Sequence, residues 1–412
     1  MFNRRDIEHR IRKTAEYFGY QEICTPTFEH AELFIKKSGL EIVEQLYTFR
    51  DKGDRELVLR PELTAPAIRF YANDLYNLPK PLKIFYLGNC FRYERPQKGR
   101  FREFWQFGAE LIGTDNPEGI AELIKLACNC LTNAGLNSYV LRVGDLNILK
   151  SILKDWEIFG ETQKKFLTAL DKGDIDSVRI ILEDTGRSPD DVDAFFALIQ
   201  AKKSSIEFNQ RADQLVNLFP DIEQYLTRLK DVIRFLRLFG ISEFNIDLGI
   251  ARGLDYYIGI VFEIDVETLG AEKQVCGGGE YSLEELFDLK NIACSGFAIG
   301  FDRVVLAVEL QGVSKAEYDL DIFIIPLSKE GLEKTIELAQ PLRDAGYKVD
   351  FDIKGRNISK NLKYANGKNA KYALFIGEDE LAKNSGLLRE MESGEQKDVK
   401  FDELVEFFQK MI

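Results

Sequence analysis

The sequence predicts an α+β protein, in which a domain of mixed helices and strands is interrupted by a helical segment and followed by a small α/β domain. Three observations support this prediction. Residues 1–145 mix helical spacing with β-like runs, residues 146–240 have the pattern of successive amphipathic helices, and residues 318–412 alternate strands with helices. Because β-like runs resume in residues 241–312, we expect this segment to complete one discontinuous domain with residues 1–145.

Length and composition exclude several classes of protein. The chain has 412 residues, of which 45% are hydrophobic and 30% charged, and no long apolar run is present. A disordered chain and a membrane-spanning protein are therefore not expected. Residues 1–20 lack the apolar stretch of a signal peptide, so export is not expected either. The net charge of −13 argues against a generic nucleic-acid binder.

Histidine and cysteine are scarce in the chain. The only histidines are His9 and His30, so the chemistry is not expected to use the protein's own imidazoles. Cys128 and Cys130 are the only close pair among six cysteines. Residues two apart on a helix point in different directions, so this pair is a poor chelate and no metal site is expected. We expect all six cysteines to be buried or half-buried in a reducing cytoplasm.

The first domain begins with a predicted helix. Apolar residues at helical spacing from Ile7 to Phe18 predict a helix that ends at Gly19. A short extended segment at residues 21–30 follows and is broken by Pro26. Aromatic and branched residues then predict β-like runs at 56–64, 83–95 and 103–113. A helix is expected after them, at 118–135.

The later segments have clear periodicity. Helices are expected throughout 146–240 and a linker around 312–318. In the last domain the alternation predicts a partly parallel sheet. Its expected strands cover 321–327, 348–353 and 371–377, and its expected helices cover 330–346, 358–369 and 402–412.

The densest group of charged residues lies in a predicted hairpin, CFRYERPQKGRFREFWQFGAE, at residues 90–110. Arginine side chains bind phosphate oxygens at two points, and Phe104 and Trp105 nearby suit a stacked base. The hairpin therefore suits a polyphosphate with an attached base, and a solvated hairpin with surface charge is the alternative. The basic residues between the two strands are Arg92, Arg95, Lys98, Arg100 and Arg102.

Polar groups also occur where buried strands are expected. Glu62 and Thr64 follow a strand and suit an ammonium group, although a turn with a helix cap is the alternative. Arg252 interrupts a β-like run, where an unpaired buried charge would cost several kcal/mol. Gly277–Gly279 permit a close backbone approach without the spacing of a dinucleotide fingerprint. Arg303 lies at a helix start, a favourable place for an anionic ligand.

The chain resembles the histidyl-tRNA synthetases, which are class II aminoacyl-tRNA synthetases, and is similar to their archaeal type. The resemblance rests on four segments in this order and spacing: RPELT, FRYERPQKGRFREFWQFGAE, ARGLDYY and GFAIGFDR. The tail, GRNISKNLKYANGKNAKYALFIGEDEL, is similar to the anticodon-binding domain of that family. The helical segment lies where the family carries its insertion domain.

The resemblance implies a catalytic domain on an antiparallel sheet at 1–145 and 241–312, a helical insertion domain at 146–240 and an anticodon-binding domain at 318–412. It implies a cytoplasmic homodimer that acts as a histidine–tRNA ligase. Such an enzyme activates L-histidine with ATP and Mg²⁺ to histidyl-adenylate, releases pyrophosphate, and transfers histidine to the 3′ end of tRNA(His).

The resemblance also implies roles for single residues. Catalysis at the α-phosphate falls to Arg92 and Arg252. ATP binding falls to Arg92, Arg100, Phe104 and Arg303. Histidine binding falls to Glu62, Thr64, Gln106, Glu110, Arg252, Tyr256 and Tyr257. The acceptor end of the tRNA faces Arg95 and Gln97, and Pro26 matches a proline of the dimer interface.

The negative net charge is reconciled with an RNA substrate by a local basic segment. No acidic residue occurs from Ile353 to Gly377. Because phosphate contacts need cations only where the RNA lies, the other surfaces can be acidic. A solvated helix face is the alternative interpretation of this segment. The tRNA-binding residues expected here are Lys354, Arg356, Lys360 and Lys363.

Three positions depart from the family pattern, and two other functions compete. Leu63 stands where bacterial members usually have glycine, and Glu280 and Ser282 stand where arginine and aspartate are frequent, so neither of the latter two is given a role. One competing function is the non-catalytic, synthetase-like regulatory subunit of ATP phosphoribosyltransferase in histidine biosynthesis. Such subunits typically lack the anticodon-binding tail. The other is a class II synthetase for another amino acid, which would lack RGLDYY.

Overall fold

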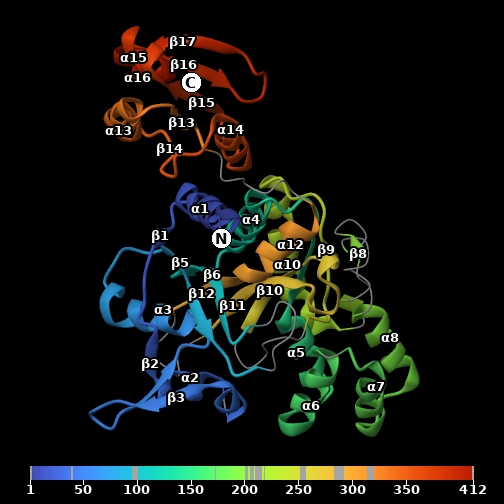
Figure 1. Ribbon diagram of the computed structural model, residues 1–412. Helices are drawn as coiled ribbons and strands as arrows, with labels where there is room; N and C mark the ends of the chain where they lie inside the picture. Colours follow the sequence, from blue (N-terminus) through green and yellow to red (C-terminus); the bar gives the residue numbers. More distant parts are fainter. Residues whose placement is uncertain are drawn as a thin grey trace. The chain divides into compact units, whose positions relative to one another are not determined.

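The computed structural model forms two compact units, Arg4–Ser314 and Lys315–Ile412, the latter together with Met1–Asn3 (Figure 1). Each unit has its own sheet and its own hydrophobic core. The domain boundaries expected from the sequence, including those of the helical insertion, stay predictions. The residues described are 2–38, 40–94, 101–171, 173–199, 203–204, 208, 216–217, 219–250, 257–282, 292–312 and 320–410.

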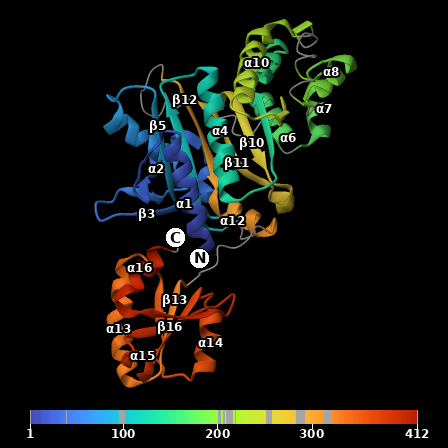
Figure 2. The same ribbon diagram turned by 90° about the horizontal axis from the view of Figure 1, so that it is seen from above.

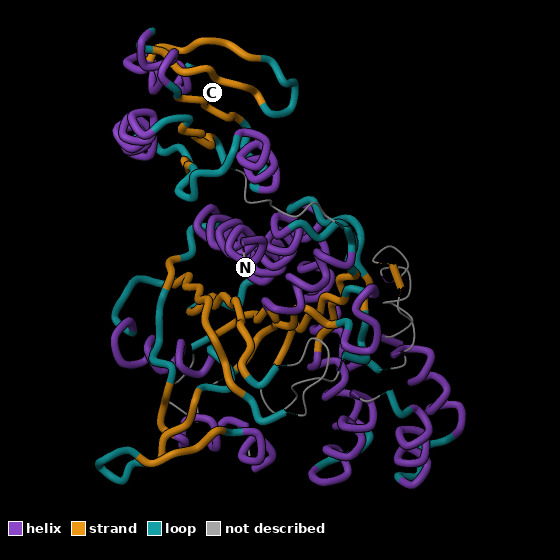
Figure 3. The backbone as a smooth tube through the Cα atoms, viewed as in Figure 1, coloured by secondary structure: helices purple, strands orange, loops and turns teal. Residues whose placement is uncertain are grey.

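The first unit is built on a nine-stranded sheet in the order β1-β5-β6-β12-β11-β10-β7-β9-β8 (Figures 1 and 3). Every pairing from β5 to β7 in that order is antiparallel, whereas β1 pairs with β5 and β9 with β7 in parallel. This agrees with the antiparallel sheet expected for the first domain. The strands are β1 Gln21–Glu22, β5 Leu82–Phe91, β6 Glu103–Ile112, β7 Val140–Asp145, β8 Lys203–Ser204, β9 Asn245–Ile246, β10 Tyr257–Asp265, β11 Gln274–Tyr281 and β12 Cys294–Gly300.

The two faces of β6 have different surroundings. Side chains alternate across a strand, so Phe107, Ala109 and Leu111 share one face. They belong to the main core together with apolar residues of α1 (Phe2–Tyr17) and α4 (Pro117–Ala134), the helix that packs on β6, β11 and β12 (Figure 2). Gln106 and Glu110 alternate with these residues and therefore face the other side of the sheet, away from the helical layer.

The remaining elements of the first unit follow the expected order. The helix α1 ends before Gly19, which has a φ of 79°, as the sequence predicts. A small antiparallel sheet, β2-β4-β3, precedes α3. These elements are α2 Ala31–Ser38, η1 Leu40–Gln45, η2 Tyr71–Leu75, η4 Glu267–Glu272, β2 Phe28–His30, β3 Tyr47–Arg50, β4 Glu56–Leu59, α3 Thr64–Phe70 and α12 Phe301–Leu310.

The described part of the helical segment 146–240 contains the expected amphipathic helices, but the expectation of helices throughout was wrong at β8, a two-residue strand that pairs with β9 at the edge of the sheet. Their apolar faces, with Trp156 and Phe195 among them, join the same core as α4, and α10 packs directly on α4. These helices are therefore fixed to the helical layer that covers the sheet. They are α5 Leu146–Asp155, α6 Gly160–Asp171, α7 Ile175–Asp184, α8 Pro189–Ile199, η3 Pro220–Ile222 and α10 Glu223–Leu238.

The second unit is an α/β domain with a five-stranded sheet in the order β14-β13-β15-β16-β17. Its first three strands are parallel, as expected, and the last two are antiparallel. The hairpin of β16 and β17 was not predicted from the sequence. The elements are β13 Ile322–Pro326, α13 Lys329–Asp344, β14 Val349–Phe351, α14 Ile358–Gly367, β15 Tyr372–Ile376, α15 Glu378–Ala382, β16 Ser385–Glu390, β17 Gln396–Lys400, η5 Phe401–Glu403 and α16 Leu404–Gln409.

The cysteines confirm the expectation of burial in all but one case. All six are free thiols, and five are buried, but Cys24 is exposed. The expectation was wrong for Cys24 because it lies at the edge of the sheet, just after the two-residue strand β1, where Gln21 and Glu22 are also exposed. In the part of the chain that the structure describes, no helix has the length and apolar character needed to cross a membrane.

Candidate functional site

A cavity of about 400 Å³ opens in the first unit beside four strands of the sheet and the start of α12. Among its lining residues are several that the sequence singles out, including Arg92, Phe104, Trp105, Gln106, Tyr257 and Arg303. They come from segments separated by more than 150 residues of sequence, so the fold is what joins them. Other lining residues are Glu94, Ile250, Glu263, Gln274, Cys276, Gly277, Gly278, Ala298, Gly300 and Asp302.

Arg92 is held at the end of the hairpin formed by β5 and β6. Its Nε donates a hydrogen bond to the Pro61 carbonyl oxygen at 2.9 Å, and its guanidinium carbon lies 5.1 Å from the centroid of the Phe104 ring. A guanidinium has five N–H donors, so these contacts leave several donors for a ligand. Arg92 and Phe104 thus present a cation and an aromatic face to the same cavity.

Arg303 lines the cavity from the first turn of α12, where β12 ends at Gly300 and the helix begins. Its Nη1 donates to the Gln274 carbonyl oxygen at 2.9 Å, which anchors the side chain against β11. The amino end of a helix carries unsatisfied N–H groups and partial positive charge. Arg303 and the start of α12 therefore favour an anion at this end of the cavity.

Glu110 lies fully buried in the sheet at the centre of a hydrogen-bonded group. The Tyr86 hydroxyl donates to Oε1 at 2.7 Å and the Tyr281 hydroxyl to Oε2 at 2.5 Å. Thr64 Oγ1 lies 3.0 Å from the Tyr86 hydroxyl. Burial raises the pKa of Glu110 to about 7, against the opposing effect of these hydroxyl donors.

Two glycines make room for this group. A Cβ at Gly108 would overlap the ring of Tyr86, and a Cβ at Gly296 would overlap the Glu110 carboxylate. Both glycines lie on strands that flank or contain Glu110, so the absence of side chains is a requirement of the site. The polar centre is thus built into the sheet by residues from β5, β6, β11 and β12.

Glu62 caps the helix that follows it. Its carboxylate accepts hydrogen bonds from the backbone N–H groups of Thr64 at 2.6 Å and Ala65 at 3.0 Å. The helix cap, which the sequence offered as the alternative interpretation of Glu62, is therefore present. Glu62 directly follows Pro61, whose carbonyl oxygen accepts the hydrogen bond from Arg92. On β6, Gln106 Oε1 accepts a hydrogen bond from the Cys90 thiol at 3.3 Å.

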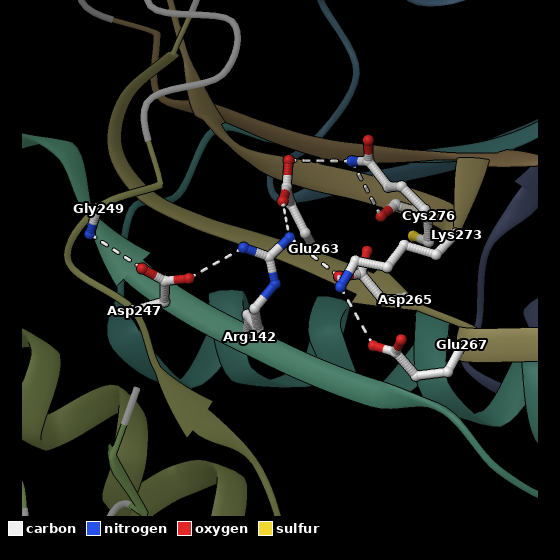
Figure 4. A network of polar contacts seen from close by, with 9 residues as sticks. Arg142, Asp247, Gly249, Glu263, Asp265, Glu267, Lys273 and Cys276 are labelled. Atoms are coloured by element: carbon white, nitrogen blue, oxygen red, sulfur yellow. Dashed lines mark hydrogen bonds and ion pairs between the residues drawn. The ribbon is translucent and has the colours of Figure 1, made fainter. Parts of the chain in front are cut away.

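A charged network that the sequence did not identify is centred on Arg142 (Figure 4), and its members Glu263 and Gln274 line the cavity. Arg142 donates to Asp247 at 2.9 Å and to Glu263 at 2.5 Å, and lies 3.1 Å from Asp265. Gln274 Nε2 donates to the other Glu263 oxygen at 3.0 Å. Since Glu263 lines the cavity, Arg142 offsets the negative charge that it would present to an anionic ligand.

Some predicted residues cannot be placed. Arg252, Tyr256, Arg95, Gln97 and Arg100 lie outside the described residues. Sequence reasoning also missed residues that the structure brings to the site, namely Tyr86, Glu263 and Tyr281. A useful signal was present for two of them, because Tyr281 closes the glycine-rich strand and Glu263 is a charge among apolar strand residues.

In the second unit, Asp352 organises the start of the predicted basic segment. It is buried and accepts hydrogen bonds from the backbone N–H of Lys354 at 3.0 Å and from the guanidinium of Arg356 at 2.7 Å. Arg356 also stacks over Tyr364, 4.3 Å from the ring centroid. Lys360 and Lys363 are exposed on α14, so they and Lys354 present the accessible charge of this segment.

No group of three or more His, Cys, Asp or Glu side chains within the described ranges is arranged to hold a metal ion. This finding covers both units but not the gaps between those ranges.

The antiparallel sheet with its polar cavity and the separate α/β domain have the architecture of a class II aminoacyl-tRNA synthetase. Two family models match the chain: histidyl-tRNA synthetase over residues 2–304 and anticodon binding domain over residues 321–411. The chain belongs to the histidyl-tRNA synthetase family.

Relatives of known name match over nearly the whole chain. A histidine–tRNA ligase of Archaeoglobus fulgidus is 42% identical to this chain, and the alignment covers 99% of this chain and 96% of the relative's length. The histidine–tRNA ligase of Methanocaldococcus jannaschii is 41% identical, with the same coverage of both chains. Among solved structures, the apo histidyl-tRNA synthetase of S. aureus aligns with a TM-score of 0.75 and 29% identity, covering 98% of this chain and 95% of its own. The histidyl-tRNA synthetase structure from Nostoc shares the fold, with a TM-score of 0.83 and 24% identity. That alignment covers 98% of this chain and 95% of the Nostoc chain.

Proposed function

We propose that this protein is a histidine–tRNA ligase, which activates L-histidine with ATP and then transfers the histidyl group to the 3′ end of tRNA(His). The observation that carries the proposal is the cavity in which Arg92, Phe104, Gln106, Tyr257 and Arg303 meet. Family membership supports the same reaction.

The first step is the attack of a histidine carboxylate oxygen on the α-phosphorus of ATP, with pyrophosphate as the leaving group. The carboxylate is already ionised, so no protein base is required. Negative charge spreads over the phosphoryl oxygens in the transition state, and preformed cations there each contribute a few kcal/mol. We assign this role to Arg92 and Arg252, the terminal phosphates to Arg100 and Arg303, and the adenine ring to Phe104.

Histidine recognition falls to the buried group beside the cavity. Glu110 and Tyr257 would bind the two imidazole nitrogens, with Tyr256 beside them, and Glu62, Thr64 and Gln106 would hold the α-ammonium group. Arg252 would face the substrate carboxylate. A site that hydrogen-bonds both ring nitrogens can reject an analogue lacking them by about 10⁴ to 10⁵.

The tRNA would contact both units. Arg95 and Gln97 would face its acceptor end, and Lys354, Arg356, Lys360 and Lys363 would contact phosphates in the second unit. Because Asp352 already neutralises Arg356, we expect the three lysines to carry most of the salt-dependent affinity.

Mg²⁺ would enter with ATP as part of the substrate, because it keeps water and phosphate ligands and needs few from the protein. We also propose a homodimer with Pro26 at its interface and a cytoplasmic location. Light scattering on the purified protein tests the dimer, since a mass of one chain at micromolar concentration would contradict it.

The deciding experiment is ATP–pyrophosphate exchange with Mg²⁺ and each of the proteinogenic amino acids in turn. We expect exchange with histidine alone. A folded sample without histidine-dependent exchange would exclude the ligase. If it still bound histidine, the regulatory subunit of ATP phosphoribosyltransferase would be favoured, and exchange with a different amino acid would indicate another class II synthetase.

A further inference from the structure

The strand that carries Tyr257 into the cavity is irregular at that point. In the pairing of β10 with β11, Tyr257 lies opposite Tyr281 and Val261 lies opposite Gly279. Residues 258–260 of β10 therefore bulge opposite the single residue Glu280. Such a bulge interrupts the ladder and re-aims the adjacent side chains, so its geometry decides where Tyr257 points.

Glu280 fills this bulge with its side chain. Its Oε2 accepts a hydrogen bond from the backbone N–H of Ile260 at 2.7 Å, in place of a ladder partner. A Cβ at Gly259 would overlap the Glu280 carboxylate, so glycine is required there. Glu280 is only 6% exposed, and a buried carboxylate of this kind needs a cation.

The cation comes from α10, in the helical segment 146–240. Both terminal nitrogens of Arg228 donate to the Glu280 carboxylate, and Nη2 also donates to the Asp115 carbonyl oxygen at 2.6 Å. Planar two-point pairing of this type fixes the orientation of a carboxylate as well as its charge. Arg228 thus orients the Glu280 carboxylate that accepts the hydrogen bond from the Ile260 N–H.

A second side chain from the same segment holds the other end of the bulge. Lys150 of α5 donates from Nζ to the Tyr257 carbonyl oxygen at 3.0 Å, and α5 packs against β10. The bulge is therefore held by α5 at Tyr257, the residue that precedes it, and by α10 at its last residue, Ile260, through Glu280. Tyr257 lines the cavity and Tyr281, its partner across the strands, binds Glu110.

We infer that Arg228 and Lys150 are positioning residues, through which the helical segment fixes Tyr257 for histidine binding. This inference rests on the proposed function. It also gives Glu280, which departs from the family pattern, a role that does not involve contact with substrate. The helical segment then acts on amino-acid affinity and leaves the ATP end of the cavity, with Arg92 and Arg303, unchanged.

The test measures the KM for histidine and for ATP in pyrophosphate exchange, together with Tm and direct histidine binding by calorimetry. We expect Arg228→Met to raise the histidine KM and Kd at least about tenfold and to change the ATP KM by less than about twofold. We expect Lys150→Met to raise the histidine KM about threefold or more. The matched controls, Arg179→Met in the exposed pair with Asp193 and Lys154→Met on α5, should leave both KM values unchanged.

A double variant separates positioning from stability alone. Arg228→Met with Glu280→Gln removes both members of the ion pair and leaves no unpaired carboxylate at position 280, so Tm should recover relative to the single Arg228→Met variant. The histidine KM should stay raised, because α10 no longer anchors the side chain at position 280. If the histidine KM recovers together with Tm, or if it never changes, the inference is wrong although the ligase is confirmed. Absence of histidine-dependent exchange in the wild-type protein would overturn the proposed function itself and this inference with it.

Discussion

At the scale of single residues, the role proposed for Arg92 in the first chemical step can be tested directly. We predict that Arg92→Ala lowers the rate of adenylate formation at least about 10²-fold, because it removes a preformed donor from the developing charge. The measurement is single-turnover adenylate formation with saturating histidine and ATP. Arg102→Ala is the control on the same hairpin, since that side chain stacks on Tyr93 at 4.4 Å. A rate near wild type for Arg92→Ala would remove Arg92 from the chemistry.

A second prediction at the scale of single residues concerns Glu110 and the pH dependence of the protein's stability. The folded protein raises the pKa of this carboxyl to about 7, so between about pH 4.5 and pH 7 the folded state keeps a proton that the unfolded state releases. Stability from Glu110 is therefore complete below the unfolded pKa and is lost as the pH rises through 7, by on the order of 3 kcal/mol.

Glu110→Gln removes this titration: its amide oxygen can still accept from one tyrosine hydroxyl, whereas its NH2 group must donate to the other. We expect Tm of the variant to fall less than wild-type Tm between about pH 5 and pH 7.5. A remaining slope is expected, because burial also raises the pKa of Asp145 to about 7. The exposed Glu118→Gln on α4 is the control. If the Tm of wild type and of Glu110→Gln changed in parallel with pH, the pKa of Glu110 would be the same in the folded and the unfolded protein, which would contradict the prediction.

At the scale of elements, the sequence pattern predicts strands that have a buried face and misses those that do not. The hairpin of β5 and β6 was predicted because both strands are rich in branched and aromatic residues. In β17 only Val399 is buried, so no alternation marks the strand and the hairpin with β16 was missed. The cavity was predicted in part, from motifs within single segments. In the buried group, Glu110 and Thr64 were named from the sequence, but Tyr86 and Tyr281 were not, because they meet at Glu110 only through the order of strands in the sheet.

The helix α14 supports an element-scale prediction on tRNA. We expect Lys360→Glu with Lys363→Glu to weaken tRNA binding and to lower the slope of log Kd against log salt by roughly 1.5, the effect of two lost phosphate contacts. Histidine-dependent exchange should not change. The control is the same double substitution at Lys397 and Lys400 on β17, at the other edge of the sheet. An unchanged salt slope would place the tRNA elsewhere.

At the scale of the whole molecule, adenylate formation is assigned to the first unit alone, whereas the lysines proposed to contact tRNA phosphates belong to the second unit, which has its own core. The cavity and its buried polar centre lie entirely within Arg4–Ser314, whereas the exposed lysines of α14 lie within Lys315–Ile412. The negative net charge of −13 is thus compatible with an RNA substrate, because the cations that would contact phosphates are local. The same division implies that the two activities can be lost separately.

We therefore predict that a chain ending at Ser314 keeps histidine-dependent exchange within about tenfold of the full-length rate, because every described cavity residue is retained. Transfer of histidine to tRNA should fall at least about 10²-fold at a tRNA concentration near the full-length KM, because the contacts of the second unit are lost. Both rates are measured on the same preparation, after circular dichroism has shown that it is folded. Equal loss of the two activities in a folded sample would show that the first unit depends on residues 315–412 for adenylate formation.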